Sequence, residues 1–181
     1  MGTELLAEDP AAELLERATQ GDAEAFAALV RQHQRMVFGI SWHFFRDPAV
    51  AEDLAQDVFL QLFQHLREIR SESHLVFWLR QVATRKCIDH ARWRQRQGQP
   101  PLDLEAASQV AAEAERGDSG DLEQLRRLVA GLPASFRAVV TLRYQEDLPP
   151  GEIARVLGCP VNSVKSRLQR ALALLRERMK P

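Results

Sequence analysis

LPPGEIARVLGCPVNSVKSRLQRALALL, residues 148–175, decides how the end of this chain folds. Gly158 follows Ile153 and Ala154 by about one turn and can adopt the left-handed conformation that ends a helix without steric cost. Pro160 then opens a new helix, because proline fits a first turn but cannot continue the preceding helix. The stretch therefore predicts two helices joined by a tight turn.

The second of these helices has an apolar edge at Val164 and Leu168 and a polar face of amides, hydroxyls and cations. Such a mixture suits base edges and phosphates in the major groove, so we interpret the pair as a helix-turn-helix DNA reader. A helical hairpin with a solvated basic face is the alternative. Hydroxyl residues near the start of the helix also predict capping. The polar face comprises Asn162, Ser163, Lys165, Ser166, Arg167, Gln169 and Arg170.

The charge of the chain is distributed in blocks. The 181 residues carry a net charge of −1, which argues against a uniformly basic DNA coat, and the length suits one large domain or two small ones. Residues 80–96 and 155–180 are basic, whereas residues 103–123 are acidic. Two basic modules joined by an acidic segment predict two separate nucleic-acid contacts.

No pattern in the sequence predicts catalysis. There is no phosphate-cradling glycine loop or nucleophile elbow, and Cys87 and Cys159 lack CxxC partners. Cys87 and His90 lie one turn apart, but two ordinary helix residues are the better interpretation, because zinc requires more ligands. We therefore predict no enzyme, catalytic residue, metal, cofactor or small-molecule substrate. No run is apolar enough for a membrane span and the start lacks a signal-peptide pattern, so we expect a cytoplasmic protein.

Helical periodicity dominates the remaining sequence, and strands have little support. Residues 22–42 carry an apolar stripe, and Asp47-Pro48 opens a further helix over residues 51–66 with leucine or valine every fourth position. Residues 67–74 are predicted to form an exposed loop and residues 75–96 a long helix, in which Phe77, Val82 and most of Trp78 are assigned to core packing. Residues 98–120 read as a flexible linker, before a second bundle. The fold class is all-α, with two small helical domains.

Three motifs in this order resemble the extracytoplasmic-function sigma factors, the two-domain subunits that start bacterial transcription. The motifs are AEDLAQDVFLQLF from residue 51, WLRQVATRKCIDHAR from residue 78 and LPPGEIARVLGCPVNSVKSRLQRAL from residue 148. The resemblance covers nearly the whole chain. It implies an N-terminal helical extension (1–21), a sigma2-like domain that binds core polymerase and opens the minus-ten element (22–97), an acidic flexible linker (98–120) and a sigma4-like domain that binds the minus-thirty-five element (121–181).

The resemblance also implies roles for individual residues. The polymerase-binding segment contains Glu52, Asp53, Gln56, Asp57 and Phe59. The minus-ten contacts are a base-holding loop of Ser71, Glu72, Ser73 and His74, and backbone contacts from Arg80, Arg85, Arg92 and Arg94. The minus-thirty-five contacts are Lys165, Ser166, Gln169 and Arg170, with Asn162, Ser163 and Arg167 beside them and Arg143 in support. The implied partners are core RNA polymerase, promoter DNA and an anti-sigma factor.

Some positions depart from the family pattern or allow a second interpretation. Asn162-Ser163 stands where glycine-threonine is common, and Ser163 is expected to keep the capping hydroxyl; Arg85 replaces a common asparagine. Asp89 and Arg92, three residues apart, form a structural pair in the alternative interpretation. The acids of residues 52–57 favour their own helix dipole as well as a basic partner. At the level of the whole chain, the rivals are a DNA-binding regulator that acts without polymerase and a platform for an anti-sigma partner.

Overall fold

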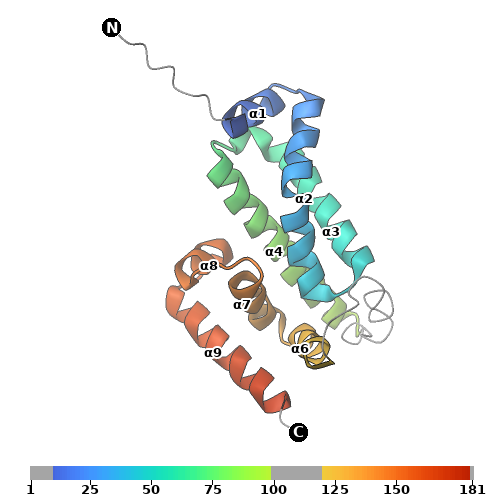
Figure 1. The fold of residues 1–181 in the computed structure, drawn as a ribbon, viewed down its shortest axis with the longest axis vertical. Helices are drawn as coiled ribbons and strands as arrows, with labels where there is room; N and C mark the ends of the chain where they lie inside the picture. Colours follow the sequence, from blue (N-terminus) through green and yellow to red (C-terminus); the bar gives the residue numbers. More distant parts are fainter. Residues whose placement is uncertain (1–9, 99–119, 180–181) are drawn as a thin grey trace.

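The computed structural model describes residues 10–98 and 120–179 as helices joined by short turns, with no strand within those ranges. The first group of helices is α1 (Pro10–Thr19), α2 (Ala23–Phe45), α3 (Pro48–His65), the 3-10 turn η1 (Leu66–Glu68) and α4 (Glu72–Arg96). The second group is α6 (Gly120–Ala130), α7 (Ala134–Tyr144), α8 (Pro150–Leu157) and α9 (Val161–Arg178). The predicted all-α class with two helical domains is confirmed (Figure 1).

The first domain packs α2, α3 and α4 around one apolar core, which α1 covers at one end (Figure 1). Both α2 and α3 begin where the sequence predicts. Asp22 accepts hydrogen bonds from the Glu24 and Ala25 amides, and Asp47 accepts one from the Val50 amide. Residues spaced three or four apart then face inward, among them fully buried Ile40, Phe44, Val58, Leu62 and Leu79.

The second domain holds the helix-turn-helix. α8 ends at Gly158, whose φ of 61° is the left-handed conformation that the sequence predicts, and α9 begins directly after Pro160. Ile153, Ala154 and Val164 are buried where the two helices cross. A second apolar cluster, which includes Leu132 and Ala171, fixes the far half of α9 against α6 and α7.

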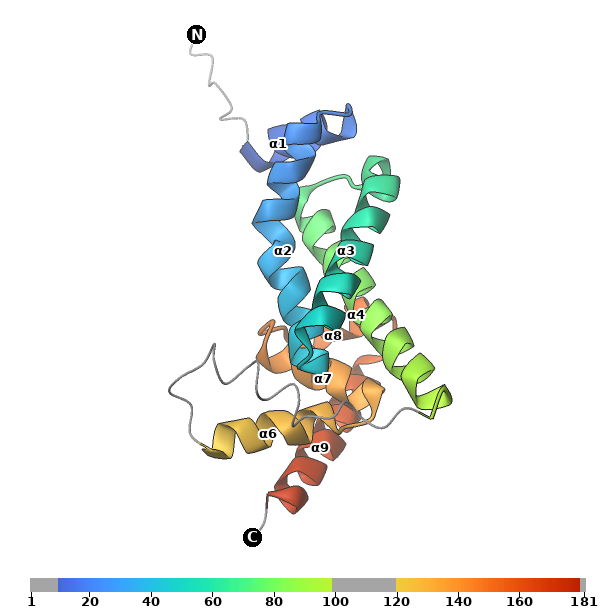
Figure 2. The ribbon, with the colours of Figure 1, turned by 90° about the vertical axis from the view of Figure 1, so that its right-hand side faces the viewer.

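The two domains pack against each other. α4 contacts α7 and α8, and α2 contacts α6 and α7 (Figures 1 and 2). Ala138 of α7 is buried in the core cluster of the first domain, and Leu157 packs against clusters of both domains. Phe77, which was assigned to core packing, is half-buried against the apolar cluster of the second domain. Periodicity predicts that a residue is buried, but not which surface buries it.

The domain boundaries given above stay predictions, and the predicted linker (98–120) lies almost entirely outside the described residues. No helix in residues 10–98 and 120–179 combines the length and the apolar character that crossing a membrane requires.

Candidate functional site

The predicted polymerase-binding residues lie on α3. Ala51, Leu54, Val58 and Leu62 bury one face of this helix. Consequently the residues between them point outward: Glu52, Asp53, Gln56 and Asp57 are all exposed. Phe59 differs, since it is half-buried and packs against the core of the domain. We call these five the docking residues.

The docking residues face two directions. Glu52, Gln56 and Phe59 line a groove between α3 and α2. Asp57 lies on the other side of the helix, where its Oδ2 accepts a hydrogen bond from Lys86 Nζ of α4 at 3.0 Å. One acidic segment therefore carries two different surfaces.

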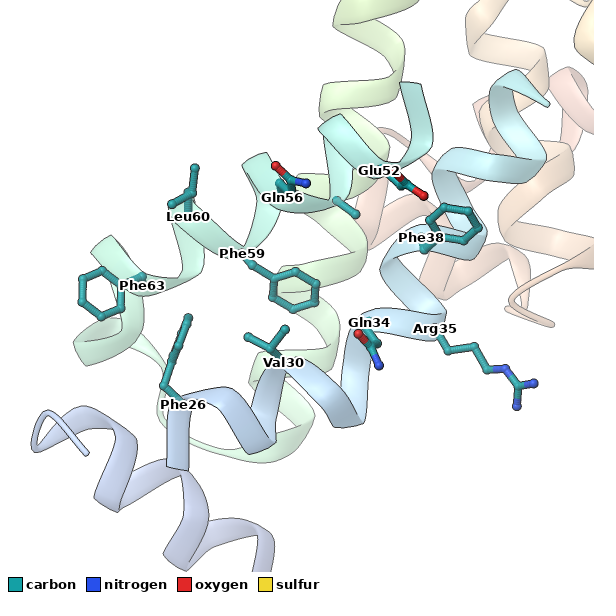
Figure 3. A pocket seen from close by; sticks show the side chains of 11 residues that line it. Phe26, Val30, Gln34, Arg35, Phe38, Glu52, Gln56, Phe59, Leu60 and Phe63 are labelled. Carbon is teal, nitrogen blue, oxygen red and sulfur yellow. The ribbon is translucent and has the colours of Figure 1, made fainter. Parts of the chain in front are cut away.

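The groove beside Glu52 and Gln56 is largely apolar (Figure 3). It has a volume of about 870 Å³, and we call it the apolar groove. Leu60 and Phe63 are 62% and 66% exposed at its edge, which is unusual for large apolar side chains. Phe26 of α2 meets Phe63 edge-on, with ring centroids 5.3 Å apart. Neither Leu60 nor Phe63 was predicted as a functional residue. Phe63 widens the apolar stripe that predicts the core, and Leu60 lies outside that stripe, where a single apolar residue carries no functional signal.

The predicted loop over residues 67–74 needs correction, because helix α4 begins inside it at Glu72. The cause is local: Ser71 is the N-cap, its Oγ accepts the His74 amide at 3.2 Å, and Glu72 places a carboxylate at the positive end of the helix. Glu72 also accepts a hydrogen bond from Gln32 of α2 at 3.1 Å. The four predicted base-holding residues therefore form the N-cap and first turn of α4 rather than part of a loop.

A small polar cavity lies beside this first turn. Ser71 and His74 line it together with Arg67, Arg70 and Trp78, around a volume of about 700 Å³. His74 is fixed there, since its Nδ1 accepts the Arg70 amide at 3.2 Å. Trp78 is half-buried, so part of its ring borders the cavity and part packs on the core. The cavity is therefore flanked by an aromatic face, two arginines and one hydroxyl, and also by the carboxylate of Glu68.

The four predicted backbone-contacting arginines on α4 differ in their surroundings. Arg85 and Arg92 are exposed and Arg94 is half-exposed. Arg92 lies 3.9 Å from Asp89 in an exposed ion pair, a distance too long for a hydrogen bond. Arg80 instead donates from Nε to Oε2 of Glu146 in the second domain at 3.0 Å.

On α9, most of the predicted DNA-contacting residues share one exposed face. Asn162, Lys165, Ser166, Gln169 and Arg170 all point to solvent. Arg167 differs from them: it is half-buried, and its Nη1 lies 3.6 Å from the Cys159 thiol in the turn between α8 and α9.

The other two predicted residues of this domain, Arg143 and Ser163, differ in their contacts. Arg143 on α7 donates a hydrogen bond to the Leu148 carbonyl at 3.3 Å. This bond connects α7 to the segment just before α8, as a supporting residue would. The expected capping role of Ser163 is wrong. The N-cap is Pro160, without a side-chain hydrogen bond, and Ser163 lies inside the first turn, where its hydroxyl makes no cap.

The thiol and imidazole one turn apart on α4 are both buried to some degree. Burial raises the pKa of the Cys87 thiol to about 12, and the thiol donates to the Ser41 hydroxyl at 3.5 Å. Burial, and then the nearby Arg94, lower the pKa of His90, which favours a neutral ring at pH 7. Within residues 10–98 and 120–179, no three histidine, cysteine, aspartate or glutamate side chains cluster as metal ligands.

Comparison with known proteins assigns each half of the chain to a family segment. Residues 29–97 match sigma-70 region 2, and residues 122–175 match sigma-70 region 4. The RNA polymerase sigma-H factor of Pseudomonas aeruginosa is 30% identical over 192 residues, covering 98% of this chain and 97% of that protein. The ECF RNA polymerase sigma-E factor of Haemophilus influenzae is 28% identical, covering 93% and 94%.

Two solved structures share the fold. CnrH, solved in complex with the cytosolic domain of CnrY, superposes with a TM-score of 0.69 at 23% identity and covers 94% of this chain and 97% of its own. The sigma factor RpoE of Bartonella quintana, solved with the anti-sigma factor NepR, gives a TM-score of 0.65 at 19% identity and covers 86% and 96%.

Proposed function

The chain belongs to the extracytoplasmic-function sigma factors of the sigma-70 family, and we propose which of its surfaces perform each step of transcription initiation. As an RNA polymerase sigma factor, it associates with core polymerase and directs promoter recognition. The residue roles below rest on the positions and contacts of the side chains.

Core polymerase docks on α3 and on the apolar groove beside it. The observation that carries this assignment is the juxtaposition of exposed acids with exposed large apolar side chains on one helix. Leu60 and Phe63 are exposed to solvent in the free protein, and an exposed apolar patch of this kind is typical of a protein-binding surface. Glu52 and Gln56 border the same groove. The complementary partner is therefore an amphipathic helix with basic residues along its rim.

Promoter opening takes place around the first turn of α4. An unstacked non-template base enters the cavity beside Ser71 and His74, where the face of Trp78 offers a stacking surface. Arg80, Arg85, Arg92 and Arg94 follow along the same helix and hold the phosphates of the freed strand. Unstacking costs a few kcal/mol, so base capture and phosphate contacts offset part of that cost and polymerase binding supplies the remainder.

The exposed face of α9 enters the major groove of the minus-thirty-five element. Lys165, Gln169 and Arg170 offer cations and an amide to base edges and phosphates. Arg167, held near Cys159, supports the turn instead of contacting a base.

The chain itself performs no chemistry in this scheme, and it requires no metal, cofactor or small-molecule substrate. Strand separation by trapping needs only binding free energy. The scheme places the protein in the cytoplasm, where polymerase and promoter are found.

An anti-sigma factor is the expected antagonist. The solved RpoE structure contains an anti-sigma factor, and the CnrH structure contains the cytosolic domain of CnrY. Covering the apolar groove would both bury Leu60 and Phe63 and exclude polymerase.

The test is comigration of the purified full-length protein with bacterial core RNA polymerase on size exclusion. The wild-type chain is expected to comigrate, and Leu60→Asn is expected to comigrate far less, because the docking surface loses an apolar side chain that polymerase would bury. Met179→Asn, which alters an apolar side chain that is 43% exposed at the end of α9, serves as the control and should behave as wild type. Absence of comigration together with tight binding to duplex DNA alone would instead identify a free-standing regulator.

A further inference from the structure

A carboxylate from the second domain occupies one of the proposed DNA contacts. Arg80 lies on α4, and its Nε donates to Glu146 Oε2 at 3.0 Å, although the two residues are 66 positions apart in the sequence. Both side chains are well covered, at 25% and 11% exposure. The pair is therefore screened less by solvent than an ordinary surface ion pair.

The face of α4 that carries Arg80 also packs against the second domain. Phe77 packs against the apolar cluster that contains Val156, and Gln81 Nε2 lies 3.5 Å from the Val156 carbonyl. Because Phe77, Arg80 and Gln81 are three or four residues apart, or adjacent, they lie along one side of the helix. The ion pair is thus part of a packed surface.

A second anchor joins the domains at the end of α2. The Arg137 guanidinium of α7 donates to the Phe44 carbonyl at 3.0 Å and to the Leu132 carbonyl at 2.9 Å, and it lies 4.9 Å from the centre of the Phe44 ring. The carbonyls of a final helical turn lack intrahelical partners and carry partial negative charge, so a cation is stabilised there. Burial lowers the pKa of Arg137 to about 10, which leaves the side chain charged at neutral pH.

The contact also narrows access to the first turn of α4. Ser73, His74 and Arg80 share a cleft with Leu148, Glu152 and Arg155 of the second domain. Carboxylate and phosphate oxygens use the same guanidinium donors, so a phosphate cannot take the Nε position of Arg80 while Glu146 holds it. Glu152 and Arg155, in the same cleft, lie 3.8 Å apart and largely offset each other's charge, so the competition rests on Glu146.

We propose that Glu146 is an intramolecular competitor of promoter DNA, which keeps the free protein closed until the second domain moves away from α4. The inference rests on the proposed DNA role of Arg80. Binding to core polymerase would then favour the open arrangement, and the open arrangement would make Arg80 available.

The experiment compares variants of the full-length protein without polymerase. The probe is a fluorescein-labelled mixed-sequence single-stranded DNA of twelve nucleotides, and affinity is measured by anisotropy at one fixed, low salt concentration. Glu146→Gln removes the competing charge while keeping the shape, and it is expected to bind about fivefold more tightly than wild type. Glu177→Gln is the matched control: it removes the same charge from an exposed side chain in the last turn of α9, and it should leave the affinity unchanged within twofold.

A double-variant comparison identifies the source of the gain. In an Arg80→Ala background, Glu146→Gln should have no further effect, because the group that it releases is absent. No gain in the single variant, an equal gain in Glu177→Gln, or an equal gain in the Arg80→Ala background would each overturn the proposal. Circular dichroism verifies that every variant is folded.

The DNA-binding test of Glu146 and the comigration test of the proposed function can fail independently of each other. If Glu146→Gln gains affinity through Arg80 but the wild type never comigrates with polymerase, the closed contact stands and the polymerase role falls. If comigration succeeds and the gain is missing, the competitor role of Glu146 falls alone.

Discussion

Asp57 of α3 and Lys86 of α4 form an ion pair, in which Asp57 Oδ2 lies 3.0 Å from Lys86 Nζ. A proposed polymerase contact therefore interacts directly with the helix that is proposed to bind DNA. Asp57 nevertheless keeps 56% of its side chain exposed, whereas Lys86 keeps 21%. The carboxylate is therefore still accessible to a second cation. An exposed pair of this kind contributes at most about 1 kcal/mol to stability.

Asp57→Lys should weaken binding to core polymerase about tenfold, because the substitution sets a cation against a basic partner. The free energy of unfolding should change by no more than about 1 kcal/mol, since the site is largely exposed. Affinity is measured by titration of labelled core polymerase, and stability by urea denaturation. Lys86→Met is the control, because it removes the ion pair but keeps Asp57 in place. Retained polymerase affinity in Asp57→Lys would remove this residue from the docking site.

Lys165→Ala combined with Arg170→Ala should abolish promoter selectivity while comigration with polymerase is unchanged. Each lost base or phosphate contact costs about 1–3 kcal/mol, so run-off transcription from a promoter selected by the wild-type holoenzyme should fall at least tenfold. Arg176→Ala with Arg178→Ala removes the same charge from the exposed last turn of α9 and provides the control. Unchanged transcription in the first double variant would count against this face of α9.

Substitution can separate the capping role of Ser71, which the structure shows, from its proposed role in promoter opening. Ser71→Ala should lower the free energy of unfolding by about 1 kcal/mol, because the His74 amide loses its cap. Ser71→Asp keeps a capping oxygen and adds a charge that the helix dipole favours, so stability should be retained. Its carboxylate would nevertheless repel the incoming strand and reduce promoter opening about fivefold. Permanganate reactivity of unpaired thymines in the holoenzyme complex measures opening, and wild-type opening in Ser71→Asp would limit Ser71 to capping.

The two cysteines should differ in reactivity. Cys87 is fully buried, and its pKa is raised to about 12, whereas Cys159 is half-exposed. Iodoacetamide should therefore label Cys159 alone in the native protein and both residues in urea. Rapid native labelling of Cys87 would show that the core opens far more easily than its packing predicts.

The same thiol makes stability depend on pH. Between pH 9 and about 12 the folded state holds the Cys87 proton that the unfolded state releases, so its stabilising effect is complete below pH 9 and decreases as pH rises. The free energy of unfolding should fall by at most about 1.4 kcal/mol per pH unit in that range. Cys87→Ala should abolish this part of the slope, and an identical slope in the variant would assign the effect to other groups.

The sequence by itself determined the local structure. Gly158 and Pro160 specify the turn between α8 and α9, and Asp22 and Asp47 specify the starts of α2 and α3, because caps and turns depend on atoms within a few residues. Apolar spacing likewise identified the buried face of α3, and hence the exposure of its acids. Ser71 is a further local signal of this kind. A serine at this position favours a helix start, but the polar composition of residues 67–74 led to the prediction of a loop.

Only the tertiary structure decided which distant groups meet. Arg80 resembles its neighbouring cations in sequence, yet it pairs with Glu146. Arg137 resembles a solvated arginine, yet it is partly buried against the end of α2. Phe77 was assigned to core packing, but only the structure shows that the cluster it packs against is that of the second domain. Each of these contacts depends on the relative placement of two helical domains, which surface complementarity fixes after the helices have formed. Helical periodicity repeats every few residues and carries no information on that placement.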